Sequence, residues 1–123
     1  MAKLNKVPVA FTFVKHRGWG YELWIENRPE YCGKLLHVDG GKRGSSHFHM
    51  KKSETMYLQS GCVELELVDP ELGEPYSIFL GPGESLFIPA GQVHQIIAHR
   101  DSDLFEFSTQ HEESDSYRVK KGD

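Results

Sequence analysis

The sequence is short of cysteine and of long apolar runs. Its 123 residues include two cysteines, Cys32 and Cys62, which form neither a CxxC motif nor a dense framework. We therefore expect free, partly buried thiols rather than a disulfide scaffold. No apolar run approaches the roughly 20 residues that a transmembrane helix needs. The first residues lack the apolar core and the small-residue cleavage site of a signal peptide. These absences predict a globular, cytoplasmic protein that does not bind membranes.

Clustered positive charge is also missing. The formal net charge is −4, and no basic run is longer than Lys51-Lys52. Proteins that bind nucleic acid carry a basic patch that neutralises phosphates, so we expect no nucleic-acid partner. The length is that of a single domain with a real core.

Helical periodicity is weak throughout, and short apolar runs separated by Gly, Pro and Asp turns take its place. The segment 63–68 alternates apolar and acidic residues, as a strand with one dry face and one wet face does. The other predicted strands are 19–25, 34–38, 55–58, 75–80, 85–88, 94–98 and 104–109. This pattern predicts an all-β, antiparallel barrel or sandwich.

We divide the chain into a barrel, residues 19–111, and two flanking segments. Within the N-terminal segment, residues 1–18, the apolar stretch 7–14 is predicted to be an edge strand, either of its own barrel or against a partner. The C-terminal segment, residues 112–123, is polar, and we expect a surface tail or a short turn of helix.

Two histidines and a glutamate lie close together in the segment 44–54. His47 and His49 are two residues apart on a predicted strand, so both imidazoles leave one face, with their Cα atoms about 6.6 Å apart. Glu54 follows after a step that must contain a bend, and His94 begins a strand entered through a Pro/Gly turn. Three imidazoles and a carboxylate suit a divalent first-row metal with open positions for catalysis. The alternative, histidines that are merely polar surface residues, explains the combination less well.

The same residues resemble the two motifs of the cupin family. The first is Gly41-x5-His47-x-His49-x4-Glu54-x6-Gly61, and the second is Gly83-x5-Pro89-x-Gly91-x2-His94. The resemblance implies a double-stranded β-helix of jelly-roll type, with a zinc, manganese, iron or nickel ion held inside by His47, His49, Glu54 and His94. Where the second motif often ends in Asn, this chain has Ile97. Since Ile97 has the opposite strand parity to His94, we expect it to point away from the metal.

A narrower resemblance covers most of the chain from Trp19 onward. The chain is similar to small cupins related to mannose-6-phosphate isomerase, on the segments 19–24, 31–36, 47–61, 105–109, 115–118 and 122–123. This resemblance implies a homodimer that acts on a small molecule, a sugar or sugar phosphate. The reaction would be isomerisation or epimerisation through a metal-stabilised enediolate, with a base that moves a proton between adjacent carbons.

The base must lie inside the barrel, and two residues are candidates. Glu106 lies between two phenylalanines. It can act as the base only if its face of the strand lines the cavity; otherwise it is a solvated glutamate. His37 is the second candidate, although its neighbours Leu36 and Val38 compete for the inward positions.

A phosphorylated substrate also needs cations at the mouth of the barrel. Lys34, Arg43 and Lys51 lie near the ligand strand in the sequence, and Lys51 shares the face of His49 if that strand continues. The alternative for each is an ordinary solvated side chain.

Two other functions fit the same ligand set. The three histidines and the glutamate also resemble the centre of cupin dioxygenases, which use iron or nickel on a small enolate. A cupin that binds a sugar or metabolite through its metal without turnover is the third possibility. The motifs alone do not separate these functions.

Overall fold

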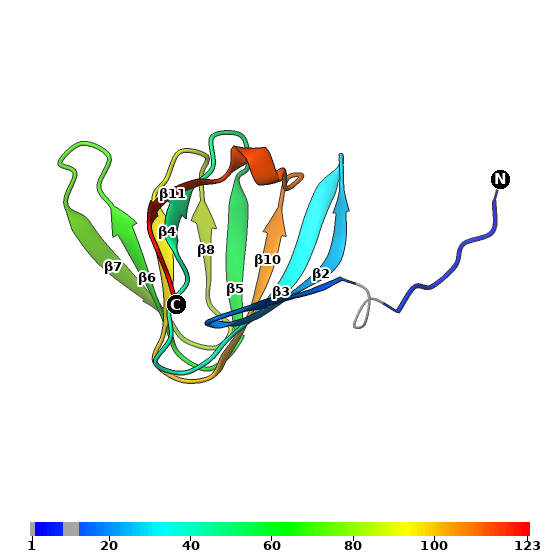
Figure 1. Cartoon of the computed structure of the whole chain (residues 1–123), viewed down its shortest axis with the longest axis horizontal. Coiled ribbons are helices and arrows are strands. Elements are labelled where there is room, and N and C mark those ends of the chain that lie inside the picture. Colours follow the sequence, from blue (N-terminus) through cyan, green and yellow to red (C-terminus); the bar gives the residue numbers. More distant parts are fainter. Residues whose placement is uncertain (1, 9–12) are drawn as a thin grey trace.

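Two antiparallel sheets face each other in the computed structural model, which describes residues 2–8 and 13–123 (Figure 1). The six-stranded sheet has the order β1-β2-β3-β10-β5-β8. Its strands are β1 Val14–Arg17, β2 Gly20–Arg28, β3 Tyr31–Val38, β10 Ser102–Ser108, β5 Glu54–Ser60 and β8 Ser85–Ile88. The five-stranded sheet has the order β11-β4-β9-β6-β7. Its strands are β11 Tyr117–Lys120, β4 Ser46–Phe48, β9 His94–Ala98, β6 Val63–Val68 and β7 Pro75–Leu80.

This architecture is the predicted all-β jelly roll. The observed bounds of β6, β7, β8 and β9 coincide with the predicted segments 63–68, 75–80, 85–88 and 94–98. These bounds could be predicted because turn residues with Gly, Pro or Asp flank these strands, and in β6 the alternation agrees with the turns. In β6, for example, Val63, Leu65 and Leu67 are buried and the residues between them are only half-buried.

Inward-facing positions change from apolar to polar along the strands, and this change locates the site. In β5 the buried residues run from Glu54 to Met56 and Leu58, and in the antiparallel β10 they run from Leu104 to Glu106. The apolar positions form a continuous core that includes Leu36, Val38, Met56, Leu58, Val63, Leu65, Leu80, Ile88, Ile96, Ala98 and Leu104. The barrel therefore has an apolar end, which stabilises it, and a polar end at the start of β5 and the end of β10.

The C-terminal segment contains more structure than predicted. Residues Glu113–Asp115 form a short 3-10 helix, η1, which agrees with the predicted turn of helix. They are followed by the strand β11, which pairs antiparallel with β4 and was not predicted. All four residues of β11 are exposed, so neither face of the strand contributes to the core. An edge strand needs only backbone hydrogen bonds to its neighbour, and a polar sequence can make them.

At the N-terminus, β1 pairs with β2 of the same chain. Residues 9–12, the middle of the predicted edge or dimer strand 7–14, lie outside the described residues. Both cysteines are free, as expected, with Cys32 buried and Cys62 half-buried. Across the described ranges, no helix is long and apolar enough to cross a membrane.

Gly61 closes the tight turn between β5 and β6. Its φ is +102°, and a Cβ at this position would lie 2.6 Å from the Asp101 carbonyl oxygen and would also collide with the Ser102 side chain. Gly73 has a φ of +70° but no atom within 4 Å of an added Cβ.

We predict that Gly61→Ala lowers the free energy of unfolding more than Gly73→Ala does. Both substitutions place alanine in the left-handed region, at about 1–2 kcal/mol. Only Gly61→Ala adds a steric clash with backbone, at about 1–3 kcal/mol more. Urea denaturation of the two variants measures the difference, and equal losses would contradict the assignment of the clash.

Candidate metal centre and cavity

A cavity of about 570 Å³ occupies the polar end of the barrel. Both sheets contribute to its lining, and so does the C-terminal segment through Ser116, Arg118 and residues 121–123. The cavity is large enough for a small organic molecule beside a metal ion.

Three histidines converge at this end of the barrel, from β4, the residue after it and β9 of the same sheet, and His47 and His49 line the cavity. His47 lies on β4 directly opposite His94, the first residue of β9. His49 lies one residue past the end of β4. One ligand atom from each imidazole falls within 4.8 Å of the others, and these three form the group able to hold a metal ion in the described ranges. Ile96 lines the cavity on the same side of β9 as His94, and Ile97 does not, as its parity predicts.

The second nitrogen of each ring fixes its tautomer. Each Nδ1 lies within hydrogen-bond distance of a backbone carbonyl oxygen, which can only accept. The acceptors are Ser45 for His47 (3.1 Å), Asp115 for His49 (3.0 Å) and Gln92 for His94 (2.9 Å). Each Nδ1 therefore carries a proton. Nε2 of His47 and His49 keeps the lone pair that binds a metal, whereas His94 Nε2 faces the Glu54 carboxylate at 2.9 Å and shares a proton with it until a metal replaces that proton.

Glu54 lies beside this cluster at the start of β5. Its Oε1 is 2.9 Å from His94 Nε2, and its Oε2 is 3.1 Å from Lys52 Nζ. Both carboxylate oxygens and His94 Nε2 are buried without a hydrogen bond of good geometry. Such groups are costly to bury, and a divalent cation between them would satisfy all three. The residues present therefore fit a divalent metal ion.

Electrostatic effects hold His47 and Glu54 in the state that a metal needs, whereas His94 must give up a proton. Burial, together with the neighbouring His94 and His49, lowers the pKa of His47 to about 4. For His94 burial acts in the same direction, but the adjacent Glu54 outweighs it and raises the pKa above its ordinary value. Burial acts to raise the pKa of Glu54, but His94 and Lys52 hold it well below its ordinary range. A metal ion would thus replace a proton shared by a buried pair.

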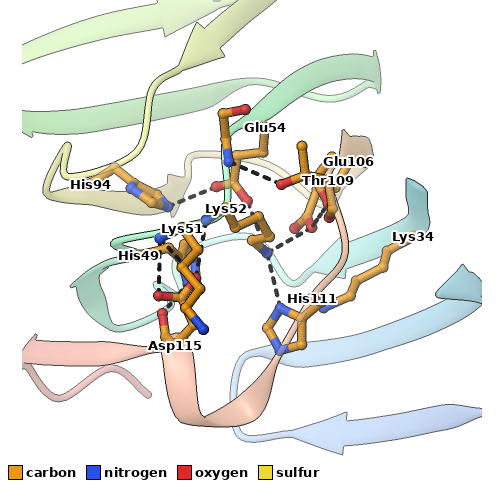
Figure 2. Close-up of polar contacts among 12 residues, drawn as sticks. Lys34, His49, Lys51, Lys52, Glu54, His94, Glu106, Thr109, His111 and Asp115 are labelled. Atoms are coloured by element: carbon orange, nitrogen blue, oxygen red, sulfur yellow. Dashed lines mark hydrogen bonds and ion pairs between the residues drawn. The ribbon is translucent and has the colours of Figure 1, made fainter. Parts of the chain in front are cut away.

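Lys52 is a buried residue of this site that sequence reasoning missed. Its Nζ is 2.9 Å from Glu106 Oε2, 3.1 Å from Glu54 Oε2 and 3.1 Å from His111 Nδ1, and Figure 2 shows it at the centre of these contacts. Burial acts to lower the pKa of Lys52, but Glu106 and Glu54 outweigh it and raise the pKa above its ordinary value. One signal was available, because Lys52 and Glu54 are two residues apart and so share strand parity.

His111 was also missed, and no pattern in its polar surroundings marks it. Its ring lies edge-on to Trp24, with centroids 5.1 Å apart, and lines the cavity. Burial, with the nearby Lys34 and Lys52, lowers the pKa of His111 to about 4. The ring is therefore a neutral member of the polar wall.

Glu106 faces the cavity. It is 4% exposed, on the inward face of β10, and burial followed by the nearby Glu54 raises its pKa. Lys34 lies on the inward face of β3, 3.5 Å from Glu22 and over the ring of Trp24. Glu106, a candidate base, and Lys34, a candidate cation, thus line the cavity as well.

His37, in contrast, lies on the outer face of β3, because Leu36 and Val38 take the inward positions. Its ring stacks on Tyr21, and its Nδ1 is 2.7 Å from Asp103. This placement corrects the expectation that His37 supplies a base inside the barrel.

Lys51 also lies outside the cavity, because β4 ends at Phe48 and the parity with His49 does not persist. Its side chain is 74% exposed and pairs with Glu112 at 3.3 Å. Arg43 is exposed and does not line the cavity. Of the three cations expected near the cavity, Lys34 therefore lines it, and Arg43 and Lys51 do not.

Two facing antiparallel sheets around a buried three-histidine cluster define a metal-binding jelly-roll domain. Residues 34–108 match the family described as the cupin domain, and the chain belongs to this family. No curated protein is significantly similar to the chain in sequence.

The solved structures with similar folds include oxalate decarboxylase from Bacillus subtilis. A tryptophan-to-tyrosine variant is 15% identical, with a TM-score of 0.81 over 97% of this chain and 34% of that one. The enzyme at pH 4.6 is 17% identical, with a TM-score of 0.77 over 97% of this chain and 33% of that one. A third structure concerns the Mn(II) centres of the same enzyme. The chain spans about a third of the length of these proteins, and the likeness establishes the shared fold.

We predict that His47→Ala and His94→Ala each abolish stoichiometric binding of a divalent metal. Each substitution removes one of three converging nitrogen ligands, and the two imidazoles and the Glu54 carboxylate that remain should hold the ion too weakly to retain it during dialysis. Metal content after dialysis against Mn(II) or Zn(II) provides the measurement.

His99→Ala is the matched control for this experiment, because His99 is a half-exposed histidine that pairs with Glu64 on the surface. It should bind metal like the wild type. Full metal content in both His47→Ala and His94→Ala would contradict the centre.

Proposed function

We propose that this cupin is a metal-dependent isomerase or epimerase of a small, oxygen-rich anion, a sugar or sugar phosphate. The observation that carries the proposal is the buried row Glu106, Lys52 and Glu54, which leads from the cavity wall to the histidine cluster. It supplies a carboxylate suited to proton transfer next to the ligands His47, His49, Glu54 and His94.

A divalent ion in this centre would act as a Lewis acid for negative charge on the substrate's oxygens. The chain's own residues would carry out the proton transfer. Glu106 Oε2 accepts hydrogen bonds from Lys52 Nζ and Ser108 Oγ, which leaves Oε1 to take a proton from a substrate carbon. The raised pKa of Glu106 brings it closer to the range in which a base is effective at neutral pH.

The cationic side chains around the cavity support an anionic substrate. Arg17, Arg118 and Lys121 line it. Arg17 pairs with Glu22 at 2.7 Å, whereas Arg118 and Lys121 make no ion pair with any residue in the described ranges. Free cations near a cavity are suited to a phosphate group. Trp19 and Trp24 add aromatic surface for the face of a sugar ring.

The oxygen-dependent alternative predicts a different substrate. A cupin dioxygenase would bind a small enolate, and an iron-loaded enzyme would consume oxygen. The mixture of carboxylates, cations and imidazoles in this cavity favours a hydroxylated substrate over an apolar one.

We predict that Glu106→Gln lowers kcat for isomer formation by about 10²–10⁴-fold, because the amide cannot accept the proton. Its metal content should stay that of the wild type. The assay follows isomer formation from a panel of sugar phosphates and free sugars without oxygen, and oxygen consumption with enolates in a parallel arm.

Glu66→Gln is the control, since Glu66 lies on β6 and pairs with Lys120 at 3.6 Å. Unchanged turnover in Glu106→Gln would remove Glu106 from the mechanism. Oxygen consumption without isomer formation would replace the proposed reaction, and tight sugar binding without any product would leave a binding protein.

We also propose a homodimer formed through the outer face of the six-stranded sheet. Phe107, Thr55 and Phe87 form one row across β10, β5 and β8. Phe107 and Phe87 are 55% and 60% exposed, Phe107 on the inner strand β10 and Phe87 on the edge strand β8. Exposed aromatic residues that are contiguous on one face are typical of an interface.

We predict that Phe87→Glu converts a dimer to a monomer, because it buries a charge in the proposed interface. Phe79→Glu on β7 is the control, since Phe79 is also 60% exposed but lies on the other sheet. Size-exclusion chromatography with light scattering gives the mass of each. A monomeric wild type, or a Phe87→Glu dimer, would contradict this interface.

A further inference from the structure

The loop between β4 and β5 carries two important residues but has little structure of its own. His49 contributes to the histidine cluster, and Lys52 contacts Glu54 and Glu106. The segment between the two strands is a bend without helix or strand. Its backbone N–H groups therefore need partners from elsewhere in the chain.

Asp115 supplies those partners. Its Oδ1 accepts hydrogen bonds from the N–H groups of Met50 at 2.9 Å and Lys51 at 3.1 Å. Its Oδ2 accepts from Lys51 at 3.1 Å and Lys52 at 3.0 Å. Asp115 is 4% exposed. One buried carboxylate thus satisfies three consecutive amides and sets the path of the loop.

The main chain of Asp115 adds a direct contact with the centre. Its carbonyl oxygen is 3.0 Å from His49 Nδ1, as Figure 2 shows, and this contact holds the tautomer in which Nε2 is free. Both ends of the residue therefore act on the same loop, the side chain on the backbone and the carbonyl on the imidazole.

The strand that follows Asp115 extends the same attachment. In β11, Tyr117 pairs with Phe48 and Arg118 pairs with His47. Residues 113–120 are thus bonded to both histidines of β4 and its loop, although they lie more than 60 positions later in the chain.

We propose that Asp115 is a positioning residue of the metal centre, and that metal binding is coupled to the docking of residues 113–120. Without the carboxylate, three amides of the loop lose their acceptor, and His49 and Lys52 lose their fixed positions. By linkage, a bound ion favours docking of the segment by the same factor as docking raises the affinity for the ion. The inference rests on the proposed metal centre.

Binding of Co(II) to Asp115→Ala and Asp115→Asn tests the positioning role. We expect the Kd to rise by about 10–100-fold in Asp115→Ala, as for other groups that orient metal ligands. Co(II) binding should be weakened less in Asp115→Asn, because Oδ1 of the asparagine still accepts hydrogen bonds from two amides. Thermal unfolding identifies any variant that fails to fold.

Asp69→Ala is the matched control. Asp69 Oδ1 accepts from the N–H groups of Glu71 at 2.8 Å and Leu72 at 3.1 Å, in the β6–β7 turn. It should bind Co(II) with the Kd of the wild type. A wild-type Kd in Asp115→Ala, or equal weakening in Asp69→Ala, would overturn the proposal.

Two further readouts separate positioning from general stability. Nitrogen-15 NMR of the histidine rings should show the Nδ1–H tautomer for His49 in the metal-free wild type and a mixture in Asp115→Ala. Hydrogen exchange should show Co(II) slowing the amides of residues 50–52 and 117–120 in the wild type. If the wild type binds no Co(II), the metal centre fails, and the NMR experiment still decides whether Asp115 fixes His49. An unchanged His49 tautomer in Asp115→Ala would overturn the positioning role.

Discussion

The site depends on the burial of unlike charges that are not fully satisfied by each other. Three imidazoles, the carboxylates of Glu54 and Glu106, and the ammonium of Lys52 lie together at one end of a small barrel. Burial of an ionised group is costly unless it is paired, so each of these groups constrains the others. Glu54 is the junction, because it contacts both His94 and Lys52 and its oxygens lack good hydrogen bonds. A divalent cation removes this deficit, which is the physical reason for a metal here.

The jelly roll makes this burial possible because the same strands carry apolar core residues at one end of the barrel and polar site residues at the other. The apolar positions of β5, β9 and β10 build a core at one end, and the next inward positions on the same strands are Glu54, His94 and Glu106. The rigid part of the fold therefore also fixes the position of the site. The loop after β4 does not belong to this rigid part, and the C-terminal segment, through Asp115, is what holds it.

Most of the fold and the convergence of the histidines could be predicted from the sequence. Alternation in the segment 63–68 and turn residues around 85–88 and 94–98 define strands locally. Contacts that depend on long-range strand pairing could not be predicted from local sequence. Lys51 was named and Lys52 was missed because nothing local shows that β4 ends at Phe48. β11 was missed because all four of its residues are exposed and it needs only backbone pairing. His111 and Asp115 lie in polar sequence, so their burial could not be foreseen.

The central claim is that His47, His49, His94 and Glu54 hold one divalent ion. The most direct test is a crystal structure of protein purified without added metal, with anomalous data collected at the absorption edge of the metal found by elemental analysis. The account predicts one strong peak bonded to the Nε2 atoms of the three histidines and to a Glu54 oxygen, at about 2.0–2.2 Å if the metal is zinc. A peak elsewhere, or an ion bonded through Nδ1 with the backbone contacts broken, would contradict it.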